Sequence, residues 1–180
     1  SLGEILRYFP MRAILQQFLV LFFHAAQITY QETGILFAGP SGAGKTTQAK
    51  LWERFRNARI ICNDRTLLRK QDGNWYGYPM DGSQPVRSGE VHVAGCIVLV
   101  KQSQNGKSSI ERLRAGKAMA QLMPQLVIDW WSENARNQAA ENLFLLLKEM
   151  PVYQLTATMD EQAVACLEKI LKMDDICRKR

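Results

Sequence analysis

The sequence predicts an α/β fold built on a mixed sheet that carries β-hairpins. A glycine-rich loop at residues 39–44 stands between a short apolar run at 35–38 and an amphipathic run at 45–56. This is the strand–loop–helix order of α/β domains. Turn signals of the Asp-Gly and Asn-Gly type at 72–73 and 105–106 separate runs with strand character, which indicates hairpins and therefore antiparallel strands in the same sheet.

The length and composition of the chain indicate one ordinary globular domain. Its 180 residues suffice for a single sheet-and-helix core, and 47% apolar with 22% charged residues argues against a disordered chain. We expect one domain over residues 1–180, with 1–23 as an N-terminal helical segment packed on it. The net charge of +6 favours anionic partners such as nucleotides. Aromatic and basic residues do not interleave as in nucleic-acid stacking surfaces, so no nucleic-acid partner is expected.

Cysteine usage and hydropathy predict a cytoplasmic protein without a membrane partner. None of the four cysteines forms a CxxC pair, and Cys62 and Cys96 lie in apolar runs, as small buried residues do in a reducing cytosol. The most hydrophobic stretch, 13–23, contains Gln16 and Gln17 and is shorter than the roughly 18 apolar residues that span a bilayer. We therefore expect a buried helix in this stretch.

The elements of the N-terminal half follow from the periodicity of apolar residues. Residues 11–21 are apolar nearly all round, which predicts a buried helix. The segments after it alternate, or form short apolar runs bounded by turn residues, as strands do. We expect a turn at 33–34, a helix at 45–56, and strands at 24–30, 35–38, 58–62, 66–69 and 75–78.

The C-terminal half begins with a loop at 79–90 that is rich in Gly, Pro and Ser and long enough to suggest a function. Trp130 and Trp131 precede a long amphipathic run and are expected to fill the core at the start of a helix, with a surface patch for a partner as the alternative. We expect helices at 115–123, 133–150 and 161–172, and strands at 94–100, 109–113 and 152–157, the first two forming a hairpin across the turn at 104–107.

Residues 39–46 fit the phosphate-binding pattern G-x-x-x-x-G-K-S/T of P-loops. The glycines let several backbone N–H groups point inward at phosphate oxygens, and the helix that follows adds its positive dipole end. Lys45 brings a full charge to the β and γ phosphates, and the hydroxyl of Thr46 is a ligand for Mg²⁺. We therefore expect a nucleoside triphosphate, ATP, to bind with Mg²⁺. The expected binding residues are Gly39, Pro40, Ser41, Gly42, Ala43, Gly44, Lys45, Thr46 and Thr47.

A carboxylate at a strand end is the second part of a magnesium site in P-loop enzymes. The apolar strand 58–62 leaves Asp64 at its carboxyl end, where we expect it to bind the metal together with Thr46. Capping a turn is the alternative role for Asp64. Asp64 follows Lys45 by only 19 residues, which leaves room for one helix and one strand and indicates a particular subset of P-loop kinases.

Five features in chain order carry a family resemblance. They are His24-Ala25-Ala26, the glycine-rich loop with its flanks at 34–47, Asn63-Asp64-Arg65, residues 75–83 and Pro151-Val152-Tyr153-Gln154-Leu155. Together they resemble the superfamily of HPr kinase/phosphorylase and ATP-type phosphoenolpyruvate carboxykinase, over about residues 20–172, and most of all its small HPr-kinase-like proteins. The resemblance implies that fold and an ATP-dependent kinase that moves the γ-phosphoryl group to a hydroxyl, such as a serine of a protein or peptide. HPr kinases are multimeric, which leaves a homo-oligomer open.

The resemblance implies catalytic roles for Lys45, Asp64 and His24. On its own, His24 is more consistent with a buried, hydrogen-bonded histidine. Asn63 departs from the pattern, because HPr kinases have an aspartate there that is a candidate general base. An amide cannot take a proton from an attacking hydroxyl.

Residues other than Asn63 must therefore be considered for the general base, and a residue that clamps the phosphate charge is also expected. Either Asp64 serves as base as well as metal ligand, or Asp81 or Glu90 of the long loop is the base, or no phosphoryl transfer occurs. Arg87 in the same loop is the first candidate for a clamp on phosphate charge, ahead of Arg65 and Arg112. A solvated surface position is the alternative for Arg87.

Two functions of different class remain open on the sequence. The first is the ATP-dependent serine kinase, and the second is a nucleotide-binding regulatory or accessory module without phosphotransfer, which Asn63 favours. A small-molecule kinase of the shikimate or adenylate type fits less well, because no arginine-rich run follows the core. Carboxykinase activity is not expected, because that reaction needs a second substrate-binding domain for which 180 residues leave no room.

Overall fold

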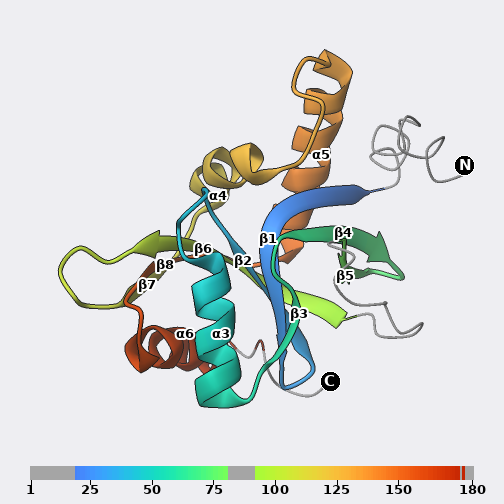
Figure 1. The fold of residues 1–180 in the computed structure, drawn as a ribbon. Coiled ribbons are helices and arrows are strands. Elements are labelled where there is room, and N and C mark those ends of the chain that lie inside the picture. The colour runs from blue at the N-terminus through green and yellow to red at the C-terminus, as the bar shows by residue number, and fades with distance from the viewer. Residues whose placement is uncertain (1–18, 81–91, 175, 177–180) are drawn as a thin grey trace, which may run out of the picture.

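The computed structural model describes residues 19–80, 92–174 and 176, and within them it shows a mixed sheet with helices on both faces (Figure 1). The strands are β1 (Val20–Tyr30), β2 (Thr33–Ala38), β3 (Arg59–Cys62), β4 (Arg65–Gln71), β5 (Asn74–Pro79), β6 (His92–Gln102), β7 (Ser109–Arg112) and β8 (Val152–Ala157). The helices are α3 (Lys45–Arg56), α4 (Ala115–Leu122), the short 3-10 helix η1 (Met123–Gln125), α5 (Glu133–Glu149) and α6 (Glu161–Met173). No described helix has the length and apolar character needed to cross a membrane.

The sheet combines parallel and antiparallel pairings. Its order is β2-β1-β4-β5-β6-β8-β7, with β3 paired to β1 and a further pairing between β2 and β6. Strands β2, β6 and β8 are parallel neighbours, whereas β1 is antiparallel to β2, β3 and β4. Because β2 pairs with both β1 and β6, the strands β1, β4, β5, β6 and β2 form a closed ring of pairings. The predicted α/β class with a mixed sheet is confirmed.

Strand β2 shows why its sequence is a continuous apolar run. Leu36 and Ala38 face a hydrophobic cluster that includes residues of α4 and α5, whereas Ile35 and Phe37 face a second cluster that includes residues of α3 and α6. Alternate side chains of a strand point to opposite faces, so a strand covered on both faces must be apolar throughout. Figure 1 shows α3 and α6 side by side on one face of the sheet.

The predicted helix at 11–21 and the helical segment expected over 1–23 are both wrong at their C-terminal ends, since β1 begins at Val20 and includes residues 20–23. The start of β1 pairs with β4, Val20 opposite Arg69, and its first four residues are buried. A run that is apolar on all sides does not distinguish a buried helix from a buried strand. Residues 1–18 lie outside the described part of the chain.

The predicted hairpin between strands 94–100 and 109–113 is also wrong. Strand β8 lies between them, parallel to β6 and antiparallel to β7. The polar β7 is largely exposed at the sheet edge, while Tyr153 and Leu155 of β8 are buried. The apolar strand therefore takes the inner position, and the polar strand is left at the edge.

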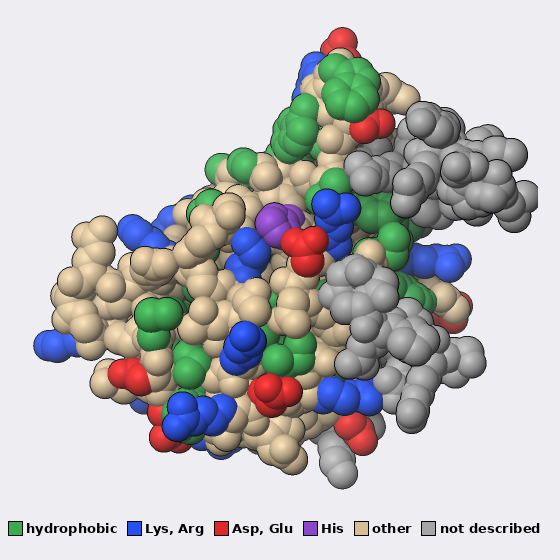
Figure 2. Space-filling model, in the orientation of Figure 1, with side chains coloured by type: hydrophobic (Ala, Val, Ile, Leu, Met, Phe, Trp, Pro, Cys, Tyr) green, Lys and Arg blue, Asp and Glu red, His purple; other side chains and the backbone are tan. Residues whose placement is uncertain are grey.

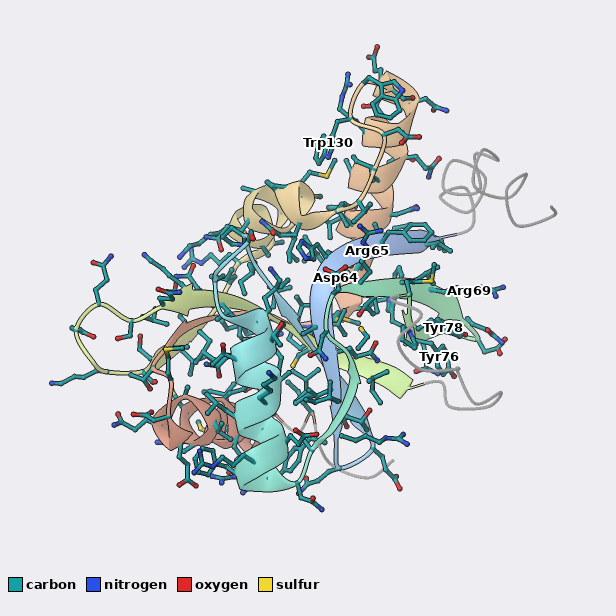
Figure 3. The ribbon with its side chains drawn as sticks, viewed as in Figure 1. Asp64, Arg65, Arg69, Tyr76, Tyr78 and Trp130 are labelled. Carbon is teal, nitrogen blue, oxygen red and sulfur yellow. The ribbon has the colours of Figure 1, made fainter. Side chains whose placement is uncertain are left out.

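Two smaller predictions fail for local reasons. The turn expected at 33–34 lies two residues earlier, at Gln31 and Glu32, which have φ angles of 47° and 64°. Trp130 and Trp131 do not fill the core, because 43% and 83% of their surfaces are exposed. They precede the N-terminal end of α5, which projects beyond the sheet in Figure 1, and Figure 3 shows Trp130 at that end.

An ion pair ties the end of α3 to α6. Arg56 Nε lies 2.7 Å from Glu168 Oε2, and the side chain of Glu168 is 13% exposed. Glu168 also accepts a hydrogen bond from Tyr30 at 2.9 Å and lies 2.9 Å from Lys172 Nζ. Burial alone would raise the pKa of Glu168. The hydrogen bonds from Lys172, Arg56 and Tyr30 outweigh this effect and bring the pKa down to about 2 from the ordinary 4.5.

We expect Glu168→Gln to lower the free energy of unfolding at pH 7 by roughly 1 to 3 kcal/mol. A carboxylate whose pKa is depressed in the folded state stabilises that state above its unfolded pKa, here 4.5, and this stability is lost as the pH falls towards 2. Urea unfolding at pH 7 and at pH 2.5 measures the effect. Glu161→Gln, which removes the more exposed partner of Arg56, is the control and should cost less. An equal loss for Glu168→Gln at both pH values would contradict the account.

Candidate functional site

Residues 39–44 form the loop between β2 and α3. Gly39, Gly42 and Gly44 have φ angles of 145°, 77° and 103°, a region that side chains rarely adopt. The loop is closed by a hydrogen bond from Ala43 N to Pro40 O at 3.1 Å. Gly44 caps α3 without a side-chain hydrogen bond. The N-terminal amides of α3 therefore remain available for an anion, as at other helix N-termini that bind phosphate.

Lys45 is folded back against the loop. Its ammonium donates to Gly39 O at 2.8 Å and to Pro40 O at 3.0 Å, and the residue is only 7% exposed. An ammonium has three donors, so these two bonds leave one for a phosphate oxygen. Burial lowers the pKa of Lys45, and the negative charge of Asp64 partly offsets this effect. The lysine is thus held at the loop by two backbone carbonyls, within electrostatic reach of Asp64.

Gly39 packs tightly against β6. A Cβ atom at this position would lie 3.0 Å from Val100 O and 3.2 Å from Ala43 Cβ. Because a backbone carbonyl cannot move aside easily, we expect Gly39→Ala to distort the loop and to lower the free energy of unfolding by about 1 to 3 kcal/mol. Chemical denaturation and nucleotide titration measure both effects.

Gly116→Ala is the matched control for that substitution. Gly116 lies in α4, and no atom lies within 4 Å of a Cβ built there. Alanine should therefore stabilise the protein by up to about 1 kcal/mol through helix propensity alone. If Gly39→Ala proved as harmless as Gly116→Ala, the close approach of the loop to β6 would be wrong.

Asp64 and His24 meet at the end of β3. The register of β1 and β4 places His24 opposite Arg65, so the preceding residue, Asp64, lies beside the histidine. His24 Nε2 is 2.7 Å from Asp64 Oδ1, and Arg65 Nε is 3.4 Å from Asp64 Oδ2. Figure 3 shows Asp64 and Arg65 close together, and Figure 2 shows a histidine next to an acidic side chain on this face. The side chain of Asp64 is 53% exposed, so it remains accessible.

The topology brings this pair to the same edge of the sheet as the glycine-rich loop. Strands β2 and β3 are both antiparallel to β1, so their carboxyl ends lie at one edge. Ala38, the last residue of β2, lies opposite Ala25, next to His24, and Cys62 at the end of β3 lies opposite Gln27. The loop, His24 and Asp64 therefore converge, although they are far apart in the sequence.

The donors at this edge suit a magnesium ion bound together with phosphates. The described residues contain no group of three or more His, Cys, Asp or Glu side chains that holds a metal on its own. Mg²⁺ is commonly bound by one or two protein oxygens, phosphate oxygens and water. The exposed Thr46 in the first turn of α3 and the exposed Asp64 are oxygen donors of this kind. Thr47, the next residue, is half-buried.

Several residues predicted from the sequence are not placed at this edge. Asp81, Arg87 and Glu90 lie outside the described residues, so their roles stay predictions. Asn63 is exposed between Cys62 and Asp64.

A cavity of about 680 Å³ adjoins the outer side of the loop and was not predicted from the sequence. It is bounded by loop residues 40–43, the C-terminal end of β6, the middle of β8, α4 and η1. Four glutamines line it: Gln102, Gln121, Gln125 and Gln154. They come from four different elements, and although Gln121 and Gln125 are four residues apart, no sequence pattern indicates that these two meet Gln102 and Gln154.

Most of the chain has similarity to a protein family and to a solved structure. A family model described as "SynChlorMet cassette protein ScmC" matches residues 6–172. Among solved structures, the chain is similar to the HPr(Ser) kinase/phosphatase from Coxiella burnetii, with 12% sequence identity and a TM-score of 0.45 over 86% of this chain and 93% of that one. A comparison with curated proteins finds no match.

Proposed function

This chain belongs to the family of SynChlorMet cassette protein ScmC, and we propose that it is a P-loop kinase. In this proposal it binds ATP with Mg²⁺ and transfers the γ-phosphoryl group to a hydroxyl, expected to be a serine of a protein or peptide. The observation that carries the proposal is the meeting of a lysine-closed glycine loop with a carboxylate–histidine pair at one edge of the sheet.

The loop and Lys45 stabilise the phosphate charge in this reaction. The backbone amides and the free donor of Lys45 bind oxygens of the triphosphate, and they gain strength as charge builds on the transferring group. Thr46 and Asp64 would hold Mg²⁺, which would neutralise further negative charge between the β and γ phosphates. His24 holds the carboxylate of Asp64 in place through the contact at 2.7 Å.

The transfer forms a bond from the acceptor oxygen to the γ-phosphorus and breaks the bond to the β–γ bridging oxygen, which leaves with ADP. The acceptor proton passes to a carboxylate. Asp64 is the candidate for this base among the residues that the structure describes. Asp81 and Glu90 of the long loop, which lie outside them, remain candidates. Phosphoryl transfer depends mainly on positioning and charge, so an asparagine at position 63 does not by itself abolish it.

An assay with ATP labelled at the γ-phosphate tests the proposal. Serine-containing peptide libraries and candidate proteins are incubated with the chain and Mg²⁺, and acid-stable label in the acceptor is counted. We expect label with the wild-type chain and none with Asp64→Ala. Asn63 favours the second candidate, a nucleotide-binding regulatory module. Tight ATP binding without label in any acceptor would support that module and overturn the kinase.

A further inference from the structure

We infer that the glutamine-lined cavity holds the base of the bound nucleotide, and that the Gln121–Gln154 pair reads either adenine or guanine by reversing its hydrogen bond. This inference rests on the proposed function, because it assumes that the triphosphate occupies the loop. It assigns a binding site to the base of the nucleotide, which the phosphate site does not specify.

The position of the cavity supports this assignment. Strand β6 pairs with β2 on the side opposite β1, so the cavity at the end of β6 and the Asp64–His24 pair lie on opposite sides of the loop. A triphosphate whose γ-phosphate points towards Asp64 therefore directs its nucleoside towards β6. The two sides are also connected along the chain, since Gln125 at the end of η1 lines the cavity and the next residue, Leu126, forms a β-bridge with Phe23, the residue before His24.

The size and chemistry of the cavity fit a nucleoside. Ligand pockets are commonly about 300–1,000 Å³, and this one measures about 680 Å³. Leu99, Pro40 and Pro124 supply apolar surface against which a flat base packs. Apart from Lys101, the lining side chains are uncharged, so the cavity suits a neutral polar group rather than a second anion. Gln102 Nε2 donates to Gly42 O at 2.8 Å, which connects the cavity wall to the loop.

The Gln121–Gln154 pair offers hydrogen bonds of either sense. Gln121 Nε2 donates to Gln154 Oε1 at 3.2 Å, and both residues are partly buried. In this state Gln121 Oε1 accepts and Gln154 Nε2 donates towards a ligand. If both side-chain amides rotate by about 180°, Gln154 Nε2 donates to Gln121 Oε1. The ligand then faces a donor on Gln121 and an acceptor on Gln154. The two states therefore present the same two positions with donor and acceptor exchanged.

This exchange matches the difference between the two purines. Adenine donates from its 6-amino group and accepts at N1, whereas guanine accepts at O6 and donates from N1. A site with fixed polar groups rejects the wrong ligand by factors of about 10⁴ or more, because its own groups are left unpaired. A reversible pair avoids that penalty. The chain should consequently bind ATP and GTP with similar affinity.

Calorimetry with the Mg²⁺ complexes of ATP, GTP and inorganic tripolyphosphate tests the inference. We expect ATP and GTP to bind within about tenfold of each other, and both at least about tenfold more tightly than tripolyphosphate. Gln154→Glu makes this position an acceptor only, which suits the N1 and N2 donors of guanine. It should shift the ratio of affinities towards GTP by about tenfold or more. Gln104→Glu, in the exposed turn after β6, adds the same charge and should leave the ratio unchanged.

The outcomes separate this inference from the proposed function. If tripolyphosphate binds as tightly as ATP, the cavity does not hold the nucleoside, while the phosphate site stands. If wild-type affinities for ATP and GTP differ more than about a hundredfold, or if Gln154→Glu leaves their ratio unchanged, the reversible pair is wrong. If none of the three ligands binds, the inference and the proposed function both fail.

Discussion

Lys45→Met should weaken the binding of Mg²⁺–ATP by about a hundredfold or more, while the protein without ligand stays folded. A charge-assisted hydrogen bond to phosphate contributes about 1.5 to 3 kcal/mol, and the upper value corresponds to more than a hundredfold in affinity. Methionine approximates the length of the lysine side chain and removes a cation whose burial lowers its pKa. The free energy of unfolding of the protein without ligand should fall by no more than about 1 to 3 kcal/mol, because the loss of the hydrogen bonds to Gly39 O and Pro40 O is partly offset by the removal of a buried charge.

Lys50→Met is the matched control for Lys45. Lys50 is an exposed lysine on the same helix, α3, so the net charge changes equally in both variants. Surface charge far from the ligand is screened by salt, and the control should retain binding within about threefold at physiological ionic strength. Calorimetry gives the affinities, and urea unfolding gives the stabilities. Unchanged ATP binding in folded Lys45→Met would rule out the lysine as a phosphate ligand.

Asp64→Asn should abolish the effect of Mg²⁺ on nucleotide binding and reduce phosphoryl transfer by about a thousandfold or more. Asparagine preserves the shape of the side chain and an oxygen that can accept from His24, but it loses the charge that attracts the ion. Metal-free ATP should bind somewhat more tightly to this variant, because a negative charge near Lys45 has been removed. The two effects have opposite signs, which simple misfolding does not produce.

Titration with ATP in EDTA and in excess Mg²⁺ measures both effects of Asp64→Asn. Asp72→Asn removes an equal charge from the exposed turn between β4 and β5 and serves as the control. Its metal dependence should equal that of the wild type. Asp64 would lose its assigned role if Mg²⁺ strengthened ATP binding to Asp64→Asn as much as it does for the wild type.

The sequence is most informative where structure depends on near neighbours. The helix predicted at 45–56 has the bounds of α3, because a glycine loop determines its start and Asn57, with a φ angle of 53°, ends it. The strand before the loop is equally local, because an apolar run between two turns has few other conformations. These are also the elements that form the phosphate loop.

The sequence-based predictions that proved wrong concern strand pairings between segments that are distant in the sequence. Whether the apolar residues 20–23 form helix or strand depends on β4, more than 40 residues later. The inner position of β8 depends on the exposure of β7 and on the burial of Tyr153. The His24–Asp64 contact follows from register, which a single sequence does not specify. For the same reason the four glutamines of the cavity carry no sequence signal.

A crystal structure with Mn²⁺ in place of Mg²⁺ and a non-hydrolysable ATP analogue tests the central claim most directly. The anomalous signal of Mn²⁺ locates the ion independently of the surrounding atoms. We expect a triphosphate enclosed by the backbone of residues 39–46, with one ion in contact with both the hydroxyl of Thr46 and the carboxylate of Asp64. A loop without triphosphate at saturating analogue, or an ion that contacts neither residue, would contradict it.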